Sequence, residues 1–531
     1  MINLSKRKLL PQETGGALPK SKHKSKRMER KKKKDVKRST QNLIPYVKMF
    51  SNGVALLPNQ RYSATIKVED INYQIANDEK REDIFSYWMQ LLNSLTPEEG
   101  MDITIHNHSL DEEQYRDDVL IKYREDDCDK YRGEINNMLI NGMKTGSNNI
   151  ISDKYISFAI KEETLDDAYR ELSTIQKELM RKLKTLGCLF PEQRMMRGSE
   201  RLELLYNIMQ PKKKLHFDYE HLDGLSTKDA IAPDGIHFEN NASFKIEDRF
   251  CKVLFLKNYS TELCDAFLSD LSKLQYNFTI NIHLKIIDQA EALQLVMRQK
   301  ATIEKDKTKE EQKAYKNGYS PEMIPEETKY SYQEARTLLE DIKTRNQRLF
   351  SCQFVMLLNC ASKEELEELE RRAINVAKKH NLNLGAIYFL QEAGFQSALP
   401  LCYSRLPIER TLTTSAAASF IPFTSMELNH RTKNSIYYGI NGISGNLLRC
   451  DRVLLLNPTG WIFGKPGSGK SFKCKEEMLM FLLMNPNVDV IVIDPEMEYV
   501  HLAKLKGIDG TIVELNNTSG NFLNPLDGEI E

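Results

Sequence analysis

Hydrophobic and polar positions change period repeatedly along the first half of the chain. Residues 62–68 alternate apolar and polar side chains, as a half-buried strand does, whereas residues 84–95 place large apolar side chains at helical spacing. Strand-like patterns follow at 101–106 and 154–160, and residues 165–186 read as a long amphipathic helix. These patterns predict an α/β unit.

A second stretch, residues 244–391, repeats that order of elements. Its last helix, 363–379, opens on Ser362 as an N-cap before two glutamates. We therefore predict two α/β subdomains related by internal duplication; the alternative is that α/β units recur in any α/β protein. The other elements expected in this stretch are strands at 251–256, 278–284 and 350–358, with a helix at 262–274.

The length of 531 residues is too great for one hydrophobic core and corresponds to about three domains. Turn residues between 210 and 243 predict a linker, and the almost wholly polar stretch 296–327 predicts an exposed helical excursion that a partner could contact. The predicted divisions are a disordered basic tail at 1–45, subdomains at 46–209 and 244–405 separated by the linker 210–243, and an incomplete P-loop NTPase domain at 406–531.

Charge is balanced overall, with 75 basic and 75 acidic residues, but the N-terminal tail is strongly basic and is densest at 31–34. Like charges at that density repel, and few apolar residues are present to offset the entropy of ordering. The tail could contact DNA, RNA or anionic lipid through counterion release. The alternative is a solvated end without a partner.

Neither a membrane-spanning apolar stretch nor a secretory signal is recognisable in the sequence. The nine cysteines include no Cys-x-x-Cys pair, which favours a reduced, cytoplasmic location. His106 and His108 share one face of a strand and could hold a metal, but no cysteine or carboxylate pattern supports them. We interpret them as exposed histidines at a sheet edge.

The strongest chemical signal is the sequence Gly-Lys-Pro-Gly-Ser-Gly-Lys-Ser at 464–471. Apolar strand patterns at 452–456 and 461–463 precede it, and a helical pattern at 472–483 follows, which is the context of a P-loop. Backbone N–H groups of such a loop surround a phosphate, and the positive end of the helix dipole faces the same anion. The sequence predicts ATP with Mg²⁺ as the ligand. The predicted binding residues are Gly464, Lys465, Pro466, Gly467, Ser468, Gly469, Lys470, Ser471 and Phe472.

Two of these residues have specific predicted roles. Lys470 is the catalytic residue and should reach the β and γ phosphates, while Ser471 should place its hydroxyl on the magnesium ion. Asp494 and Glu496 are further candidates, because Asp494 ends an apolar strand pattern at 488–494, after which another strand pattern follows at 511–515. They would form either a Walker B magnesium site or a substrate-facing end of the neighbouring strand. The second interpretation is favoured because this strand follows directly after the P-loop helix.

At these residues the chain resembles the VirB-four class of conjugal transfer ATPases of type IV secretion systems, in the form found in Gram-positive mobile elements. The resemblance is specific from about residue 350 onward and diffuse before it, where it rests on the order of elements and on 232–234. The resemblance depends more on the order of several short motifs than on any one motif. Besides the P-loop, the pieces are 391–400 (QEAGFQSALP), 410–414 (RTLTT), 421–423 (IPF), 438–441 (YGIN), 494–499 (DPEMEY) and 524–527 (NPLD).

The resemblance implies a duplicated α/β N-terminal region followed by the start of a RecA-like P-loop NTPase domain. It implies a homo-oligomeric cytoplasmic ATPase, associated peripherally with the membrane by docking on secretion-channel subunits at its inner face. The family's Walker B strand and later catalytic motifs would lie beyond Glu531, so we expect a C-terminal truncation and leave enzymatic turnover open. Remaining alternatives are a nucleotide-binding assembly scaffold without turnover and a DNA-pumping motor like HerA or FtsK.

Overall fold

A computed structural model describes residues 39–516 of the chain, with gaps at 72, 75, 98, 110–115, 117–118, 146–149, 189–192, 212, 222–223, 225, 239–240, 260–262, 318–325, 345–346, 425–429, 431, 433, 441–446 and 456. Residues 1–38 of the predicted tail and the motif at 524–527 lie outside the described residues. Within the part that is described, no helix has the length and apolar character needed to cross a membrane.

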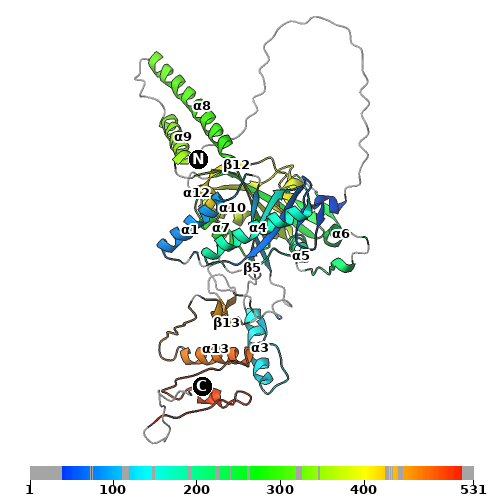
Figure 1. Cartoon of the computed structure of the whole chain (residues 1–531), viewed down its shortest axis with the longest axis vertical. Coiled ribbons are helices and arrows are strands. Elements are labelled where there is room, and N and C mark those ends of the chain that lie inside the picture. The colour runs from blue at the N-terminus through cyan, green and yellow to red at the C-terminus, as the bar shows by residue number, and fades with distance from the viewer. Residues whose placement is uncertain are drawn as a thin grey trace. The chain divides into compact units, whose positions relative to one another are not determined.

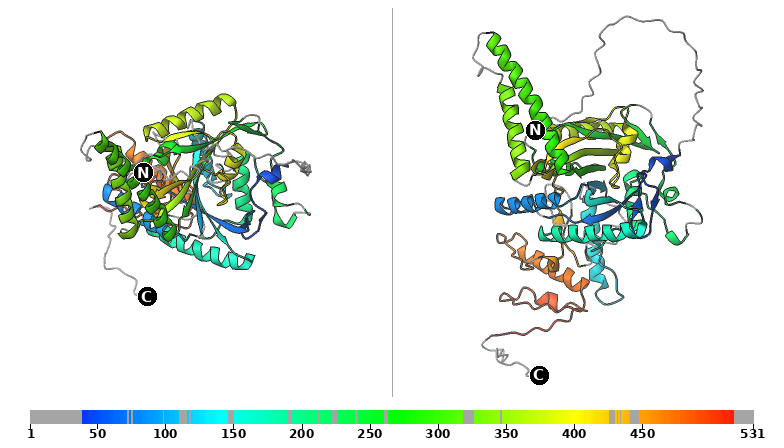
Figure 2. Two further views of the ribbon diagram at one scale, coloured as in Figure 1. Left: turned by 90° about the horizontal axis from the view of Figure 1, so that it is seen from above. Right: turned by 45° about the horizontal axis from the view of Figure 1, so that its top comes forward.

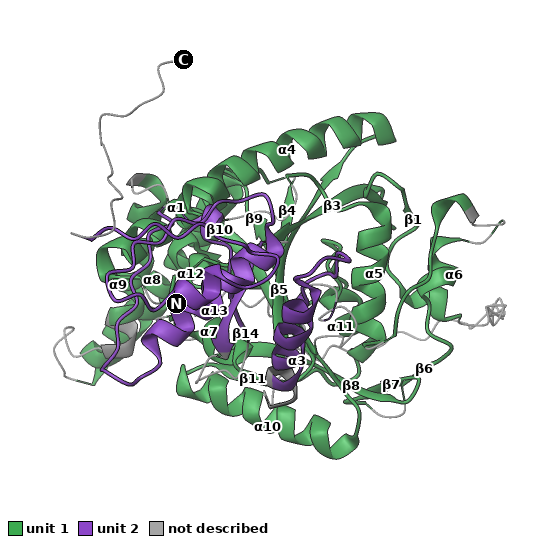
Figure 3. Cartoon of the chain, turned by 90° about the horizontal axis from the view of Figure 1, so that it is seen from below, with its two compact units in different colours: residues 1–109, 151–426 green, residues 110–150, 427–531 purple. Residues whose placement is uncertain are grey.

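The chain divides into two compact units (Figure 3). The first takes its residues from 1–109 and 151–426, and the second from 110–150 and 427–531. The range 46–209, which the sequence suggests as one subdomain, therefore contributes to both units. The predicted linker at 210–243 does not separate two compact bodies either, because both flanking ranges belong to the first unit.

The first unit is built on one large sheet with the strand order β1-β2-β3-β5-β4-β9-β10-β8-β7-β6, to which β11 is added beside β8 and β12 beside β10. Every strand pair whose register is described is antiparallel. The strands are β1 (Lys48–Met49), β2 (Ala55–Leu56), β3 (Arg61–Val68), β4 (Gly100–Ser109), β5 (Ile150–Lys161), β6 (Ile236–His237), β7 (Phe244–Ile246), β8 (Arg249–Asn258), β9 (Phe278–Ile286), β10 (Leu349–Cys360), β11 (Asn383–Ala386) and β12 (Arg410–Thr413).

Helices cover both faces of this sheet (Figures 1 and 2). Alternate residues of β10 show the division, since Phe354 belongs to one buried apolar cluster and Val355 to the other. Burial on both faces explains why β10 is almost continuously apolar, whereas the central pair β4 and β9 alternates apolar side chains with buried polar ones. The helices of the first unit are α1 (Asp78–Asn93), α4 (Leu165–Thr185), α5 (Gly198–Met209), α6 (Thr227–Ile231), α7 (Ala266–Ser272), α8 (Gln289–Lys316), α9 (Glu326–Thr344), α10 (Lys363–Lys379), α11 (Gln391–Ala398) and α12 (Thr414–Ala418), with 3-10 turns η1 (Thr40–Leu43) and η2 (Tyr219–His221).

The long amphipathic helices form where the sequence predicts them. Helix α4 buries Leu172, Leu179 and Leu183 on one face, which matches the predicted stripe. Helix α10 begins after Ser362, whose Oγ accepts the backbone N–H of Glu365 at 3.1 Å. Helix α8 covers most of the predicted polar excursion and buries only three of its described side chains.

The middle of the sheet has an order that mirrors itself about the β4–β9 pair. On one side lie β4, β5 and β3, and on the other lie β9, β10 and β8. Each half follows the chain order strand, helix, strand, long connection, strand, helix, with α1 and α4 in the first half and α7 and α10 in the second. The long connections are residues 110–149 in the first half and the segment carrying α8 and α9 in the second.

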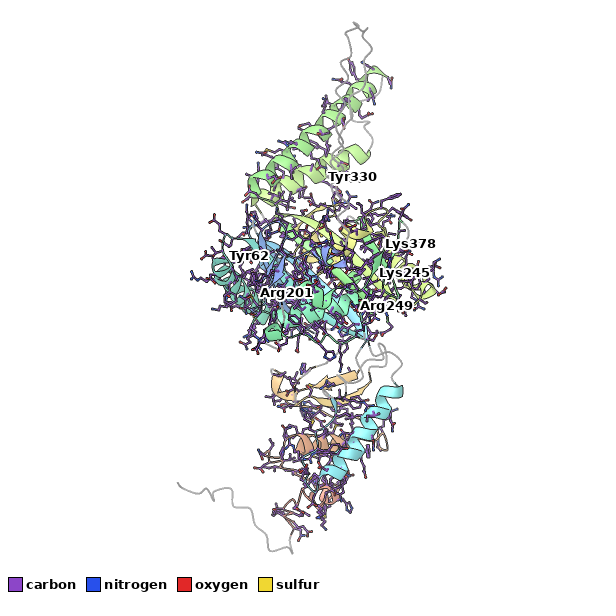
Figure 4. All side chains as sticks on the ribbon, turned by 90° about the vertical axis from the view of Figure 1, so that its right-hand side faces the viewer. Tyr62, Arg201, Lys245, Arg249, Tyr330 and Lys378 are labelled. Carbon is purple, nitrogen blue, oxygen red and sulfur yellow. The ribbon has the colours of Figure 1, made fainter. Side chains whose placement is uncertain are left out.

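Charged side chains also enter the interior of the first unit. Arg201 of α5 is 1% exposed, and its Nη1 donates to the backbone carbonyl oxygens of Gly53 and Ser63, at 2.7 Å each (Figure 4). Burial lowers the pKa of this guanidinium to about 10. The side chain therefore joins the strand region near residue 63 to a helix far along the chain.

The second unit contains α3 (Asp129–Thr145), a two-stranded antiparallel pair of β13 (Ile436–Ile440) and β14 (Leu447–Cys450), the 3-10 turn η3 (Arg452–Leu454), α13 (Lys470–Met484) and α14 (Val500–Ala503). The predicted strands at 452–456, 461–463, 488–494 and 511–515 are wrong for the described residues. Residues Arg452–Leu454 form η3, and the other segments have no strand partner in the described part of the chain. Their apolar side chains are exposed, as Ile491 at 91% and Ile493 at 93% show. A RecA-like sheet is therefore not formed among the described residues.

Candidate nucleotide-binding site

The predicted P-loop forms a compact turn that runs directly into α13 (Figure 1). The backbone N–H of Ser468 donates to the carbonyl oxygen of Lys465 at 3.1 Å. Gly469 is the N-cap of α13 and has a φ of 86°, a left-handed conformation that glycine adopts at little cost. A Cβ at Gly464 would lie 2.4 Å from the Ser468 Oγ, so a larger residue there would require the Ser468 side chain to rotate away.

The chemistry-bearing residues occupy the first turn of α13. Lys470 and Ser471 are its first two residues, and within the described part of the chain neither side chain has a hydrogen bond or ion pair. The first bond of the helix runs from the Lys473 N–H to the Gly469 carbonyl oxygen, at 2.9 Å. The N–H groups before it lack helical partners and can therefore bind an anion, together with the helix dipole.

Helix α13 is attached to β13 through Glu477. Its Oε1 accepts the Tyr438 hydroxyl at 2.5 Å and lies 2.7 Å from Nη2 of Arg452. Burial raises the pKa of the Tyr438 hydroxyl, and the neighbouring carboxylate raises it further, so the phenol stays protonated and donates. Tyr438 begins the YGIN piece at 438–441, whose last residue lies outside the described residues.

The structure places Asp494 in a turn. Its Oδ2 accepts the backbone N–H of Tyr499 at 2.7 Å. Desolvation raises the pKa of this carboxyl, but the backbone N–H groups of residues 496–499 outweigh that effect and hold the pKa below its usual range. This carboxylate is therefore engaged in capping a turn. Among the described residues, no hydrogen bond or ion pair joins Asp494 or Glu496 to Lys470 or Ser471.

The same turn lies against α13 one helical turn beyond the P-loop. The Lys475 ammonium is 5.3 Å from the centroid of the Tyr499 ring and 4.0 Å from the Glu498 carboxylate. A hydrogen bond with Cys474 raises the pKa of the Tyr499 hydroxyl to about 12. The DPEMEY piece is thus attached to the helix that carries the candidate phosphate site.

A further part of this unit could not be assigned from the sequence. An apolar core joins α13 to residues 119–139, which lie between β4 and β5 in the chain. Ile135 and Leu139 of α3 belong to it with Met480 and Leu483 of α13. The spacing of Ile135 and Leu139 is a helical signal, but nothing local identifies a partner more than 300 residues away.

No group of three or more metal-ligating side chains occurs in the described ranges. The interpretation of His106 and His108 as exposed edge histidines is wrong. His106 is 5% exposed in the interior of the sheet, its Nδ1 lies 2.9 Å from Thr279 Oγ1, and its ring stacks on that of His108. Burial lowers the pKa of His106 to about 3. β4 is a central strand, with β5 on one side and β9 on the other, which explains the difference.

No protein-family model matches the chain, and no curated protein matches it. The resemblance of the sequence to conjugal transfer ATPases therefore rests on the motifs and their order alone.

Proposed function

We propose that this chain binds ATP with Mg²⁺ through residues 464–472 and acts as the ATP-binding, energising subunit of a conjugative DNA-transfer or type IV secretion machine. The observation that carries the first part is the loop itself, in which Gly469 turns the chain into α13 with Lys470 and Ser471 on the first turn. Neither of these two side chains has a partner within the described residues.

The proposed chemistry follows from the residue types. The N–H groups of the loop and of the first helical turn surround the phosphates, and the ammonium of Lys470 meets the negative charge of the β and γ groups. The Ser471 hydroxyl is an oxygen ligand suited to Mg²⁺, which shares those phosphates. Lys470 and the metal would stabilise the charge that develops if the γ phosphate is transferred.

The second part of the proposal, the secretion machine, rests on the order of the motifs between about residue 350 and the P-loop and beyond it. The mirrored strand order of the first unit supports a duplicated N-terminal region, because a repeated unit paired edge to edge gives such an order. The exposed apolar segments at 461–463, 488–494 and 511–515 support a RecA-like domain, because they have the composition of buried strands. Secretion-channel subunits, further copies of this chain, and DNA or anionic lipid at the basic tail are the proposed partners, at the inner face of the membrane.

One observation favours the second candidate, a nucleotide-binding scaffold without turnover. Phosphoryl transfer to water needs a group that orients the attacking water, and a carboxylate commonly holds the metal. In the described part of the chain, no carboxylate forms a hydrogen bond with Ser471, and Asp494 accepts the backbone N–H of Tyr499. Co-purification with channel proteins, compared with DNA-stimulated ATP hydrolysis, would separate the subunit and scaffold from a HerA or FtsK type of pump.

Replacement of Lys470 tests the site. Lys470→Ala removes the ammonium that meets the phosphates, whereas Lys473→Ala removes the same charge one turn along the helix, where Lys473 pairs with Glu476 at 2.9 Å. Isothermal titration with ATP and Mg²⁺ should show at least about a tenfold loss of affinity for the first variant, which corresponds to about 1.4 kcal/mol. The second variant should bind like the wild type. Equal affinity of all three proteins would place the nucleotide elsewhere.

A further inference from the structure

We propose that residues 119–139 form a regulatory strap on the P-loop helix, with Arg124 and Arg132 as positioning residues that hold its C-terminal end. This inference rests on the proposed nucleotide site at the N-terminal end of the same helix. The strap would make nucleotide affinity depend on the connection between β4 and β5, two neighbouring strands of the sheet in the first unit.

Polar contacts join the strap to the end of α13. Nη2 of Arg124 donates to the carbonyl oxygen of Met484 at 2.8 Å, and Nε of Arg132 donates to that of Leu483 at 3.4 Å. These carbonyl groups belong to the last turn of the helix, where no further helical N–H follows to bind them. Two guanidinium groups there also complement the negative end of the helix dipole.

The arginines are themselves held in place by carboxylates of the strap. The Arg132 side chain is 2% exposed, and its Nη1 lies 2.6 Å from Asp129 Oδ1 and also contacts Asp126. Asp129 accepts the backbone N–H groups of Arg124 and Glu125, at 3.0 and 2.7 Å. The loop that presents Arg124 and the helix that presents Arg132 are thus one hydrogen-bonded structure.

Apolar packing makes the contact continuous. Ile121, Ile135 and Leu139 are buried with Met480 and Leu483 in one cluster. The Asn136 side chain fixes Ile121 by accepting its N–H at 2.8 Å and donating to its carbonyl oxygen at 2.9 Å. Separation of the strap from the helix therefore costs free energy, because these contacts must break. An element that couples two sites needs this property.

Helix α13 sets the distance between the phosphate loop and the strap arginines. Its 15 residues span about 22 Å, with the phosphate loop at one end and the arginines at the other. A ligand that orders the first turn therefore acts on a rod whose far end is bound by the strap. By linkage, ATP should stabilise the strap against opening, and loosening of the strap should weaken ATP binding by the same factor.

Hydrogen exchange on the full chain measures the first effect. We expect ATP with Mg²⁺, at a concentration near the wild-type dissociation constant, to slow exchange in peptides covering 119–139. At the same concentration we expect much less slowing in Lys470→Ala, which retains the strap but lacks the phosphate-binding ammonium. Peptides from α4 in the first unit provide the internal reference. This measurement uses the unaltered strap, so it does not depend on whether a strap variant folds.

Titration of strap variants measures the reciprocal effect. Arg124 is exposed, so Arg124→Gln should fold and weaken ATP binding by about fivefold, the lower end of typical coupling. Arg124→Lys keeps a positive charge at the helix end and should recover part of the affinity. Lys130→Gln is the matched control, because it removes a charge from α3 whose ammonium lies over the neighbouring Tyr131 ring.

The outcomes separate the two proposals. ATP binding that depends on Lys470 but leaves exchange at 119–139 unchanged, with equal affinity in Arg124→Gln, overturns the strap and leaves the nucleotide site standing. Absence of Lys470-dependent ATP binding overturns the proposed site and the strap with it. Slowed exchange together with a weakened Arg124→Gln supports both.

Discussion

His283 on β9 lies between two acceptors in the interior of the first unit. Its Nδ1 is 2.7 Å from Asp102 Oδ1, and its Nε2 is 2.7 Å from the carbonyl oxygen of Ser397. Both contacts are hydrogen bonds only when both ring nitrogens carry protons. Burial lowers the pKa of His283, but the charge of Asp102 and these hydrogen bonds outweigh burial and raise the pKa above its usual value.

A raised pKa in the folded state means that the folded protein binds the His283 proton more tightly than the unfolded protein does. The stabilisation is therefore complete below about pH 6.5, the ordinary histidine pKa, and is lost as the pH rises through the folded-state pKa. We predict that the urea midpoint falls between pH 6 and pH 9 in the wild type and falls less in His283→Gln. His501 is exposed, so His501→Gln is the control and should show the wild-type dependence of the urea midpoint on pH. If the midpoint of His283→Gln changed with pH as much as that of the wild type, the assignment of this pH dependence to His283 would be contradicted.

Arg201 gives a second prediction at this scale, since its guanidinium is the donor to two buried carbonyl oxygens. Arg201→Met keeps a long apolar side chain but leaves both acceptors without their donor, and we expect a loss of about 3 kcal/mol in the free energy of unfolding. Chemical denaturation measures it. Arg170, which is 80% exposed on α4, should tolerate the same replacement within about 0.5 kcal/mol.

The sequence predicts structure best where contacts are local. Gly469, Lys470 and Ser471 lie at the junction of a loop and a helix, as the sequence indicates, because these elements are adjacent in the chain. Their roles in nucleotide binding stay predictions. The partners of Arg201 and His283 lie more than 100 residues away in the sequence, and no local pattern identifies them. The same reason explains why His106 was misplaced at an edge.

At the scale of elements, burial pattern and capping predict most of the first unit. Helices α4 and α10 and strands β3, β8, β9 and β10 lie where the hydrophobic period indicates, because each buries a continuous apolar face. The apolar segments at 461–463, 488–494 and 511–515 have the composition of strands without being strands. Composition predicts a strand only where partner strands supply its hydrogen bonds.

The N-cap of α10 tests an element directly. Ser362→Ala removes the acceptor of the Glu365 N–H, so we expect a loss of about 1 kcal/mol in the free energy of unfolding. Ser362→Thr retains a hydroxyl and should recover most of it. Equal stability of the serine and alanine proteins would mean that water satisfies this N–H group equally well.

At the scale of the whole molecule, the geometry bears on catalysis. Lys470 and Ser471 are the proposed nucleotide-binding residues, and in the described residues no carboxylate forms a hydrogen bond or ion pair with them. We predict ATP turnover well below about 1 per second, the lower end of typical enzyme rates. A steady-state assay beside Lys470→Ala decides this point. Turnover at or above that rate that depends on Lys470 would contradict this prediction and show that a carboxylate of the chain acts on the nucleotide.

The division into units could not be derived from sequence patterns, because no local pattern pairs residues 110–150 with a segment that follows much later in the chain. The stretch 111–134 is richer in charged side chains than the chain as a whole, which is typical of an exposed connection. Only their packing with residues 427–516 assigns them to the P-loop unit.

The discontinuous second unit has a consequence for the protein while it is being made. Leu139 leaves the ribosome about 300 residues before Ile436, an interval of about 15–60 s at typical rates of synthesis. During that time Ile121, Ile135 and Leu139 have none of their α13 contacts and stay accessible to chaperones and to other nascent chains. Slower translation of the middle of the message should lengthen this exposure and reduce the yield of folded protein, even though the finished sequence is unchanged.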